Sequence, residues 1–139
     1  ITFPKHPINT YLFQTCTLPD VEIDQVAHGD VNRDVKTAGR VTVGNLVVGK
    51  LLTTAGSDTW LHDWLYSCQD MIAGGGLVPS QYWENVIVNE LAEDGVSVLN
   101  THLFEEVWPR KTTGLDLDRM ASENTIESIE FSVGTVDKY

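Results

Sequence analysis

The cysteine and histidine residues of this chain are its first candidates for metal binding or nucleophilic catalysis. The 139 residues include two cysteines and four histidines: Cys16, Cys68, His6, His28, His62 and His102. None of them follows the CxxC or HxxxH spacing that is typical of zinc sites. Both cysteines stand among apolar neighbours, so we expect free thiols buried in the core, with a disulfide between them as the alternative. We expect no metal ion.

Acidic residues and histidines that are neighbours in the sequence are not arranged for acid–base catalysis. His62 and Asp63 are adjacent within a predicted helix, so their side chains point about 100° apart. Glu105 and Glu106 are neighbours in a predicted strand, where successive side chains face opposite sides of the sheet. We therefore predict that the chain is not an enzyme and that it needs no cofactor.

Two further motifs resemble ligand-binding loops without completing them. Asp116 and Asp118 are spaced like the first ligands of a calcium loop, but a third acid and the glycine of the sixth loop position are missing. The three glycines at 74–76 are not followed by the Lys-Ser/Thr of a phosphate-binding loop. We interpret these glycines as the end of a helix.

The charge of the chain restricts its partners. Nine Lys and Arg residues and twenty Asp and Glu residues give a net charge of −11, and no Lys or Arg occurs from residue 51 to 109. Direct binding of nucleic acid is disfavoured, because neutralising phosphates requires a basic face. Two explanations of the acidity remain: a solvated surface that keeps the protein soluble, or a surface that repels something anionic.

Length and composition predict a single domain over residues 1–139. Apolar residues make up 42% of the chain, yet no window of about 18 of them could span a membrane. Pro4 and Pro7 interrupt the first residues, so we expect an irregular or edge segment there and no secretory leader.

One amphipathic helix is predicted at about residues 57–73. Ser57 is a suitable N-cap, and Gly74 provides the left-handed stop. Apolar residues recur three and four positions apart, which is one face of a helix. The predicted core face consists of Trp60, Leu61, Trp64, Leu65, Cys68 and Met71.

The other ordered segments are predicted to be β-strands, at residues 11–18, 21–26, 41–52, 83–91, 96–107 and 125–136. Residues 27–40 carry both signs of charge and two glycines, and we expect an extended exposed loop there. A loop of this length is either functional or poorly ordered. The pattern predicts a mainly β fold: a small antiparallel barrel or sandwich of about six strands flanked by one helix.

Several motifs, taken together and in order, resemble one known family. They are Phe13-Gln14-Thr15-Cys16 with Leu18-Pro19; Val31-Asn32-Arg33-Asp34-Val35-Lys36 with Ala38-Gly39; Asp63-Trp64; Pro79 with Tyr82; Ile87-Val88; Val107-Trp108-Pro109; Leu115-Asp116-Leu117-Asp118; and Asn124-Thr125-Ile126-Glu127. With these motifs the chain resembles the tail tube proteins of contractile-tailed bacteriophages, the T4-like family. The motifs extend over most of residues 12–136.

The resemblance implies a structural subunit of a virion tail, assembled in the cytoplasm of the host bacterium. Six copies would form a ring, and rings would stack head to tail into a hollow tube inside a contractile sheath. The partners it implies are the chain itself, the sheath protein, the baseplate or tube initiator, the tail terminator and the tape-measure protein. The extended loop would reach the adjoining ring through Asp30, Asn32, Arg33, Asp34 and Lys36.

The resemblance also implies a function for the acidic residues. A lumen that passes DNA without binding it should be acidic, because unpaired carboxylates repel phosphates. Polar strand positions are the candidates for this lumen: Glu22, Asp24, Glu127 and Glu130.

Two other functions are compatible with the sequence. One is the inner tube of an extracellular contractile injection system, which would share the fold but carry protein cargo. The other is a monomeric acidic β-barrel that recruits a basic partner. Formation of rings and tubes would distinguish both tube functions from the monomeric module.

Overall fold

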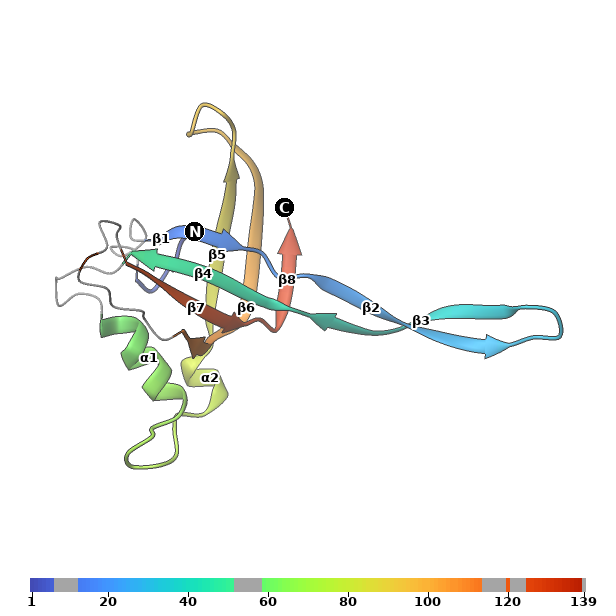
Figure 1. Ribbon diagram of the computed structural model, residues 1–139, viewed down its shortest axis with the longest axis horizontal. Helices are drawn as coiled ribbons and strands as arrows, with labels where there is room; N and C mark the ends of the chain where they lie inside the picture. The colour runs from blue at the N-terminus through green and yellow to red at the C-terminus, as the bar shows by residue number, and fades with distance from the viewer. Residues whose placement is uncertain (7–12, 52–58, 114–119, 121–124, 139) are drawn as a thin grey trace.

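The structure is a computed structural model that describes residues 1–6, 13–51, 59–113, 120 and 125–138 (Figure 1). Eight strands and two helices follow one another in these ranges. They are β1 (Phe13–Thr17), β2 (Val21–Gly29), β3 (Asp34–Val43), β4 (Asn45–Leu51), α1 (Trp60–Cys68), α2 (Pro79–Tyr82), β5 (Glu84–Leu91), β6 (Val98–Thr112), β7 (Ile126–Ser132) and β8 (Thr135–Lys138). The prediction of a mainly β fold with one substantial helix is confirmed.

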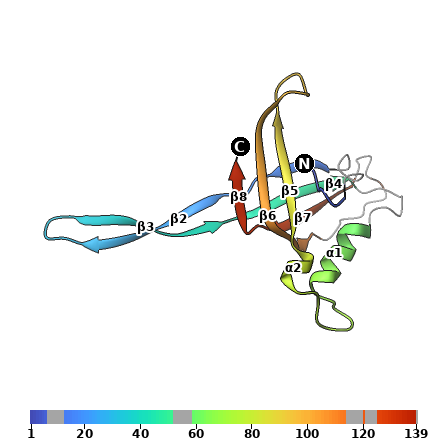
Figure 2. The same ribbon diagram turned by 180° about the vertical axis from the view of Figure 1, so that it is seen from behind.

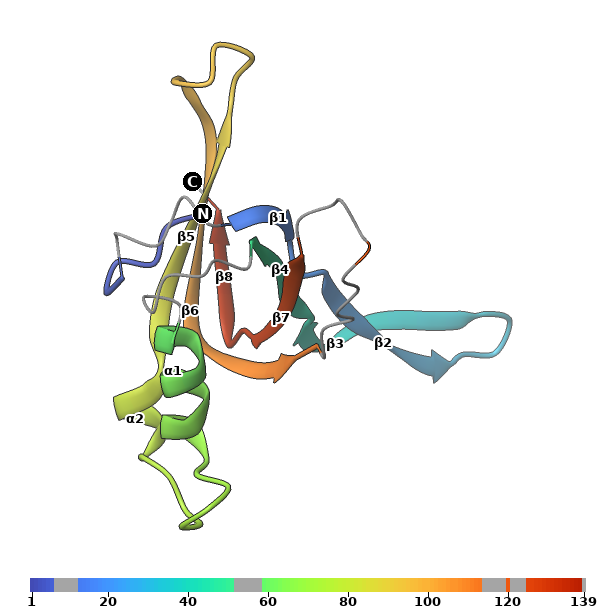
Figure 3. The ribbon, with the colours of Figure 1, turned by 60° about the vertical axis from the view of Figure 1, so that its left-hand side comes forward.

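Six of the strands form one antiparallel sheet that curves around the core. The hydrogen-bonded order is β1-β4-β7-β6-β5, and β8 joins as a third neighbour of β6. Figure 3 shows β5, β6 and β8 on one side of the body and β1, β4 and β7 on the other, with the second half of β6 sweeping below β8 toward β7. Strands β2 and β3 pair only with each other and form a separate ribbon.

Strand β6 joins the two halves of this sheet because it bends at Glu106. Its first half pairs with β5 and β8, and its second half pairs with β7 from Trp108 to Thr112. Glu106 has a φ of 56°, and within the described ranges no other residue except glycine has a positive φ. The buried positions change from even (His102, Phe104) to odd (Val107) across this bend. Such an irregularity re-aims the strand without breaking it.

An aromatic cluster fills the space inside the curved sheet. Phe3, which is fully buried, comes from the N-terminal segment, where Thr2 forms a bridge to Ile87 of β5. The Phe3 ring lies 5.7 Å from that of Phe131 on β7 and 6.3 Å from that of Trp64 on α1. The N-terminal segment therefore connects the helix and both halves of the sheet, which its prolines did not indicate.

Helix α1 is shorter than the predicted helix. It spans Trp60–Cys68, and Leu61 and Trp64 are its buried residues, while Trp60 and Cys68 are partly buried against the same core. Leu65 is half-buried. Met71 is 74% exposed and lies in a turn beyond the helix, so its assignment to the core face was wrong. The predicted N-cap, Ser57, lies outside the described residues.

The prediction of a loop at residues 27–40 was wrong in its secondary structure. These residues belong to β2 and β3, which are joined by a short turn at residues 30–33. The ribbon projects far from the body, as Figures 1 and 2 show. Pairing between β2 and β3 satisfies the backbone groups on the inner edge of each strand without an alternating apolar pattern, so the pattern used to find strands did not detect residues 27–40.

Three smaller differences concern the ends of strands and one short helix. The last predicted strand is divided at Gly134 into β7 and β8, which pair with different parts of β6. The strand predicted at 96–107 continues through Pro109 to Thr112. Residues 79–82, which lie outside the predicted helix and strands, form the short helix α2.

Gly49 of β4 lies close to two neighbouring strands. A Cβ atom placed there would clash with Thr15 Oγ1 and lie 3.2 Å from Ile126 Cγ2. Both neighbours belong to strands that pair with β4, so the clash has to be relieved by side-chain rotation or by a shift of the paired backbones.

We predict that Gly49→Ala lowers the free energy of unfolding by about 1–3 kcal/mol, because a methyl group overpacks this contact. Urea denaturation followed by fluorescence measures the change. Gly29→Ala is the matched control: nothing lies within 4 Å of its Cβ position, and the expected change is within about 0.5 kcal/mol. Adding Thr15→Ala to Gly49→Ala should restore part of the loss. Equal effects of the two glycine substitutions would contradict the steric explanation.

Candidate assembly surfaces

The β2–β3 ribbon exposes apolar side chains that its own chain does not cover. Every residue from Val21 to Thr42 is exposed, including four valines and one isoleucine at 40–55% exposure: Val21, Ile23, Val26, Val35 and Val41. Val31 in the turn is 93% exposed. A two-stranded hairpin is at best marginally stable alone in water, and contiguous exposed apolar surface usually marks an interaction site.

The apolar side chains lie on opposite faces of the ribbon in its two halves. Near the body, Ile23 is paired with Val41, and residues of this face border a cavity shared with β8. Further out, Val26 is paired with Thr37, on the other face, because strand neighbours alternate. The ribbon can therefore be buried completely only if separate surfaces cover its two sides.

The predicted inter-ring residues gather at the tip of this ribbon. Asp30 and Arg33 close the turn through a hydrogen bond from the Asp30 amide to the Arg33 carbonyl (3.0 Å), and Asn32 lies between them. Asp34 begins β3, and Lys36 follows two residues later, opposite Ala27. All five predicted residues are exposed. Their charges are of both signs and are placed where another molecule could reach them.

Two of the four predicted lumen acids, Glu22 and Asp24, lie together at the base of the ribbon. Both are exposed and share the face opposite Val21 and Ile23, since they alternate with them along β2. Because the valine face borders the cavity next to β8, the two carboxylates point away from the body.

The other two predicted lumen acids, Glu127 and Glu130, lie on opposite faces of β7. Glu130 is partly exposed and accepts a hydrogen bond from Arg110 (Oε1 to Nη1, 2.6 Å). Glu127 is 5% exposed and faces the interior, with its Oε2 3.8 Å from Lys50 Nζ and its Oε1 3.4 Å from His62 Nε2. One surface cannot contain both carboxylates, and in the single chain Glu127 is a core residue.

The buried carboxylates Glu127 and Glu84 were not recognised as core residues, although a signal was available in each strand. Glu84 stands two positions from the buried Val86, and Glu127 stands two positions from the buried Ile129, so each occupies a position of the buried face of its strand. A charge at an apolar position of a period-2 pattern predicts a buried charge that needs a partner. Lys50 and Glu127 are in fact direct partners across β4 and β7.

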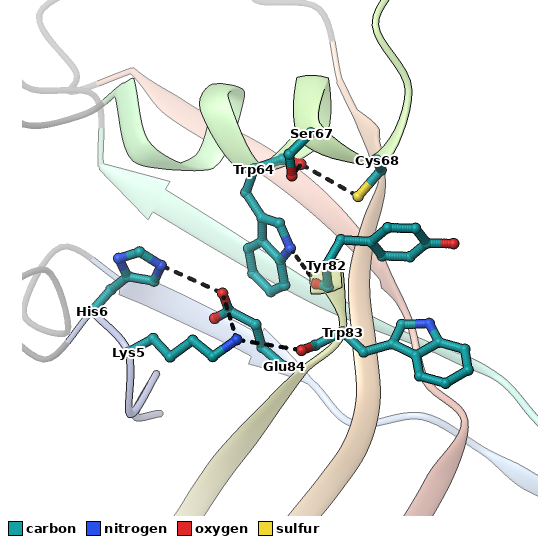
Figure 4. A network of polar contacts seen from close by, with 8 residues as sticks. All are labelled: Lys5, His6, Trp64, Ser67, Cys68, Tyr82, Trp83 and Glu84. Atoms are coloured by element: carbon teal, nitrogen blue, oxygen red, sulfur yellow. Dashed lines mark hydrogen bonds and ion pairs between the residues drawn. The ribbon is translucent and has the colours of Figure 1, made fainter. Parts of the chain in front are cut away.

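Glu84 is the centre of a polar network between the N-terminal segment and the helices (Figure 4). Its Oε1 lies 3.5 Å from Lys5 Nζ and 3.7 Å from His6 Nε2. Its Oε2 is buried and has no hydrogen-bond partner in the described part of the chain. Above it, the Trp64 indole donates a hydrogen bond to the Tyr82 carbonyl (2.7 Å), which ties α1 to α2.

The two cysteines are free thiols that do not meet. Cys16 is exposed, so the expectation of burial was wrong for this residue. It lies opposite the buried Val48, but β1 is an edge strand and its outer side is open. Cys68 is partly buried at the end of α1, donates to the Trp64 carbonyl, and burial raises the pKa of its thiol.

Among the residues that the structure describes, no group of three or more His, Cys, Asp or Glu side chains could hold a metal ion. Within the same ranges, no helix has the length and apolar character needed to cross a membrane.

Comparison with known proteins identifies the fold. The model of one family, T4-like virus tail tube protein gp19, matches residues 5–136. A search among curated proteins finds no match. A solved structure of the tube-terminating cap of the anti-feeding prophage has a TM-score of 0.75 at 16% identity, covering 91% of this chain and 79% of that one. A chain from the extended sheath–tube complex of PVC, an extracellular contractile injection system, has a TM-score of 0.73 at 18% identity, covering 91% and 80%.

The buried pair of Lys50 and Glu127 gives a prediction about stability. Glu127→Gln removes the carboxylate that faces a fully buried ammonium group, so we expect the free energy of unfolding to fall by about 3–5 kcal/mol in urea denaturation. Glu130→Gln, the matched control, breaks a partly exposed pair and should cost no more than about 1 kcal/mol. If the two variants are equally stable, the buried pair does not stabilise the fold in the way described.

Proposed function

Because the chain belongs to the T4-like virus tail tube protein family, we propose that it is the structural subunit of a phage tail tube. In this proposal six copies close into a ring, and rings stack into a hollow tube inside a contractile sheath. The tube is the conduit through which the genome reaches the host. The family is structural, so the prediction that the chain is not an enzyme is confirmed.

The observation that supports assembly most directly is the uncovered β2–β3 ribbon. It carries apolar side chains on both faces, and β2 and β3 each present a backbone edge that pairs with no other described strand. Exposed edges of this kind are normally removed by closure into a larger sheet or by a covering layer. Two neighbouring copies, one on each side, would cover both halves of the ribbon.

The tip of the ribbon is proposed to connect successive rings. It extends further from the body than any other element of the structure in Figure 1. A contact between this tip and a different surface of the next copy is heterologous, and heterologous contacts that do not close generate filaments. Asp30, Asn32 and Arg33 supply charged and amide groups for such a contact.

Glu22 and Asp24 are proposed to face the lumen. Their side chains point away from the body, and the ribbon that carries them would become part of the shared barrel wall. Carboxylates in the wall repel the phosphates of DNA and prevent it from adhering during passage.

The proposed partners follow from the same assembly. They are the sheath, the baseplate or tube initiator, the tail terminator and the tape-measure protein. The similar solved chains come from a sheath–tube complex, a tube-terminating cap and a baseplate. Membership of the tail tube family makes the chain a component of a contractile tail-like assembly. We propose that this assembly is a virion tail that is built in the bacterial cytoplasm.

An inner tube of an extracellular contractile injection system is the second candidate, because the similar solved chains belong to such systems. The fold is common to both, so the cargo distinguishes them. Neighbouring reading frames for capsid and genome-packaging proteins would favour the phage tail, and their absence beside sheath and baseplate frames would favour the injection system. A monomeric binding module would leave the apolar side chains of the ribbon exposed, so it does not explain them.

The ribbon tip can be tested by replacing residues 30–33 with Asn-Gly, a two-residue turn that suits the closing pair Gly29 and Asp34. We expect rings but no stacked tubes in negative-stain electron microscopy, because the turn touches no other part of its own chain. Circular dichroism and urea denaturation should match the unaltered protein. Tubes of normal length would contradict the inter-ring role, and an unaltered protein that never forms rings or tubes would contradict the proposed function.

The acidic lining can be tested with a charge series at the same two positions. We expect tubes from both Glu22→Gln/Asp24→Asn and Glu22→Lys/Asp24→Lys, with genome ejection slowed slightly in the first and strongly in the second, because attraction to phosphate increases along the series. Ejection kinetics in reconstituted particles, followed by release of dye-accessible DNA, measure the effect. Identical kinetics for all three proteins would exclude a lumenal role for these carboxylates.

A further inference from the structure

A cavity between the N-terminal segment, the two helices and the start of β5 shares no residue with the β2–β3 ribbon. It has a volume of about 260 Å³ and is lined by aromatic and polar side chains. Three of the lining residues are aromatic: Trp60, Trp64 and Tyr82. Two are acids, Glu84 of β5 and Asp63 of α1. Aromatic walls combined with carboxylates are the composition of sites that bind organic cations.

Glu84 is the strongest indication that a ligand belongs in this cavity. The residue is only 9% exposed, and its Oε2 has no hydrogen-bond partner in the described part of the chain. Figure 4 shows its carboxylate directed toward His6 and the Trp64 ring, which both line the cavity. Leaving a buried carboxylate oxygen without a donor is unfavourable. A ligand that supplies this donor would therefore be bound favourably.

The cations that already lie near Glu84 leave room for another donor. Lys5 Nζ and His6 Nε2 lie 3.5 Å and 3.7 Å from its Oε1, longer than the roughly 2.7–2.9 Å of a charge-assisted hydrogen bond. Lys5 is 56% exposed, and its Nζ also lies 3.4 Å from the Trp83 carbonyl. Asp63 is exposed and takes part in no ion pair within the described ranges. Among the described lining residues, two carboxylates thus meet one histidine and no Lys or Arg.

The arrangement of these groups selects the chemistry of the ligand. The free carboxylate oxygen needs an N–H donor, so a primary ammonium group fits better than a quaternary one. Aromatic rings attract ammonium groups to their faces and pack against methylene groups. One carboxylate is buried, at Glu84, and the other is exposed, at Asp63, so the inner and outer sides of the cavity can each hold one positive charge.

We propose that this cavity binds a small alkyldiammonium ion. One primary ammonium group binds the Glu84 carboxylate, the methylene chain packs against the aromatic rings, and the second ammonium group lies at Asp63. The site is made by the N-terminal segment, α1, α2 and β5, so the ligand would hold these four elements together and stabilise the folded chain. The inference goes beyond the proposed function and requires neither rings nor tubes.

The test titrates the full chain with putrescine in isothermal titration calorimetry at low salt. We expect saturable binding with a Kd of about 1 mM or tighter, which ligands of this size can reach. Butanediol, which has no charge, and tetramethylammonium, which has no N–H donor, should each bind at least tenfold more weakly. Butylamine, with one ammonium group, should have intermediate affinity. In NMR spectra of free subunits the indole N–H signal of Trp60 should shift during the titration, because Trp60 lines the cavity.

Three substitutions locate the binding site. Glu84→Gln should weaken putrescine binding at least tenfold, because it removes the buried charge. Asp63→Asn should lower the affinity for putrescine to that for butylamine, because it removes only the outer charge. Glu93→Gln, the matched control, makes the same charge change in the exposed β5–β6 turn and should leave the affinity within about twofold. Circular dichroism verifies folding, and if Glu84→Gln does not fold, Asp63→Asn and the ligand series decide.

Four results would overturn the proposal. They are the absence of saturable binding, equal affinity for tetramethylammonium, equal affinity for butanediol, and equal weakening by Asp63→Asn and Glu93→Gln, which would mean general attraction of cations to an acidic protein. Electron microscopy separates this inference from the proposed function. Subunits that bind putrescine but never form tubes would contradict the proposed function alone, and tubes of a protein that does not bind putrescine would contradict this inference alone.

Discussion

The bend of β6 at Glu106 is the constraint on which both halves of the fold depend. This one strand supplies backbone hydrogen bonds to β5, β7 and β8, so the curved sheet exists only if β6 changes direction between its two sets of partners. The change requires a positive φ at a residue with a side chain, which costs roughly 1–2 kcal/mol. Gly134 leaves space for the Glu106 side chain at this bend, since a Cβ atom at position 134 would lie 2.7 Å from Glu106 Cβ.

The sequence predicted the elements that repeat a simple period. Val86 and Val88 share the buried face of β5, and Ile129 and Phe131 share that of β7, as their spacing of two indicated. The buried stripe of α1 was recognised from its spacing of three and four. The family resemblance, carried by short motifs in a fixed order, is confirmed over residues 5–136. These features depend on local pattern, which a single sequence contains.

What could not be predicted depends on contacts between distant residues. Met71 fits the helical spacing, but the chain leaves the helix at Cys68, and a turn capped by Asp70 places Met71 in solvent. From residue 25 to residue 40 the β2–β3 ribbon lacks the regular apolar alternation by which strands are recognised. Glu127 was assigned to a surface because it is charged, whereas Lys50 on the neighbouring strand makes its burial possible. Whether such a residue is buried or exposed depends on the residues that contact it from distant parts of the chain, and the local pattern does not show these contacts.

The separation of the ribbon from the core also has a consequence for the kinetics of growth. Since β2 and β3 pair only with each other, a free subunit gains little from ordering them, and the conformational entropy of about twenty residues opposes it. At the end of an existing filament, burial of the ribbon's apolar side chains against other subunits offsets this entropic cost. In the proposed tube, elongation is then favoured over spontaneous initiation.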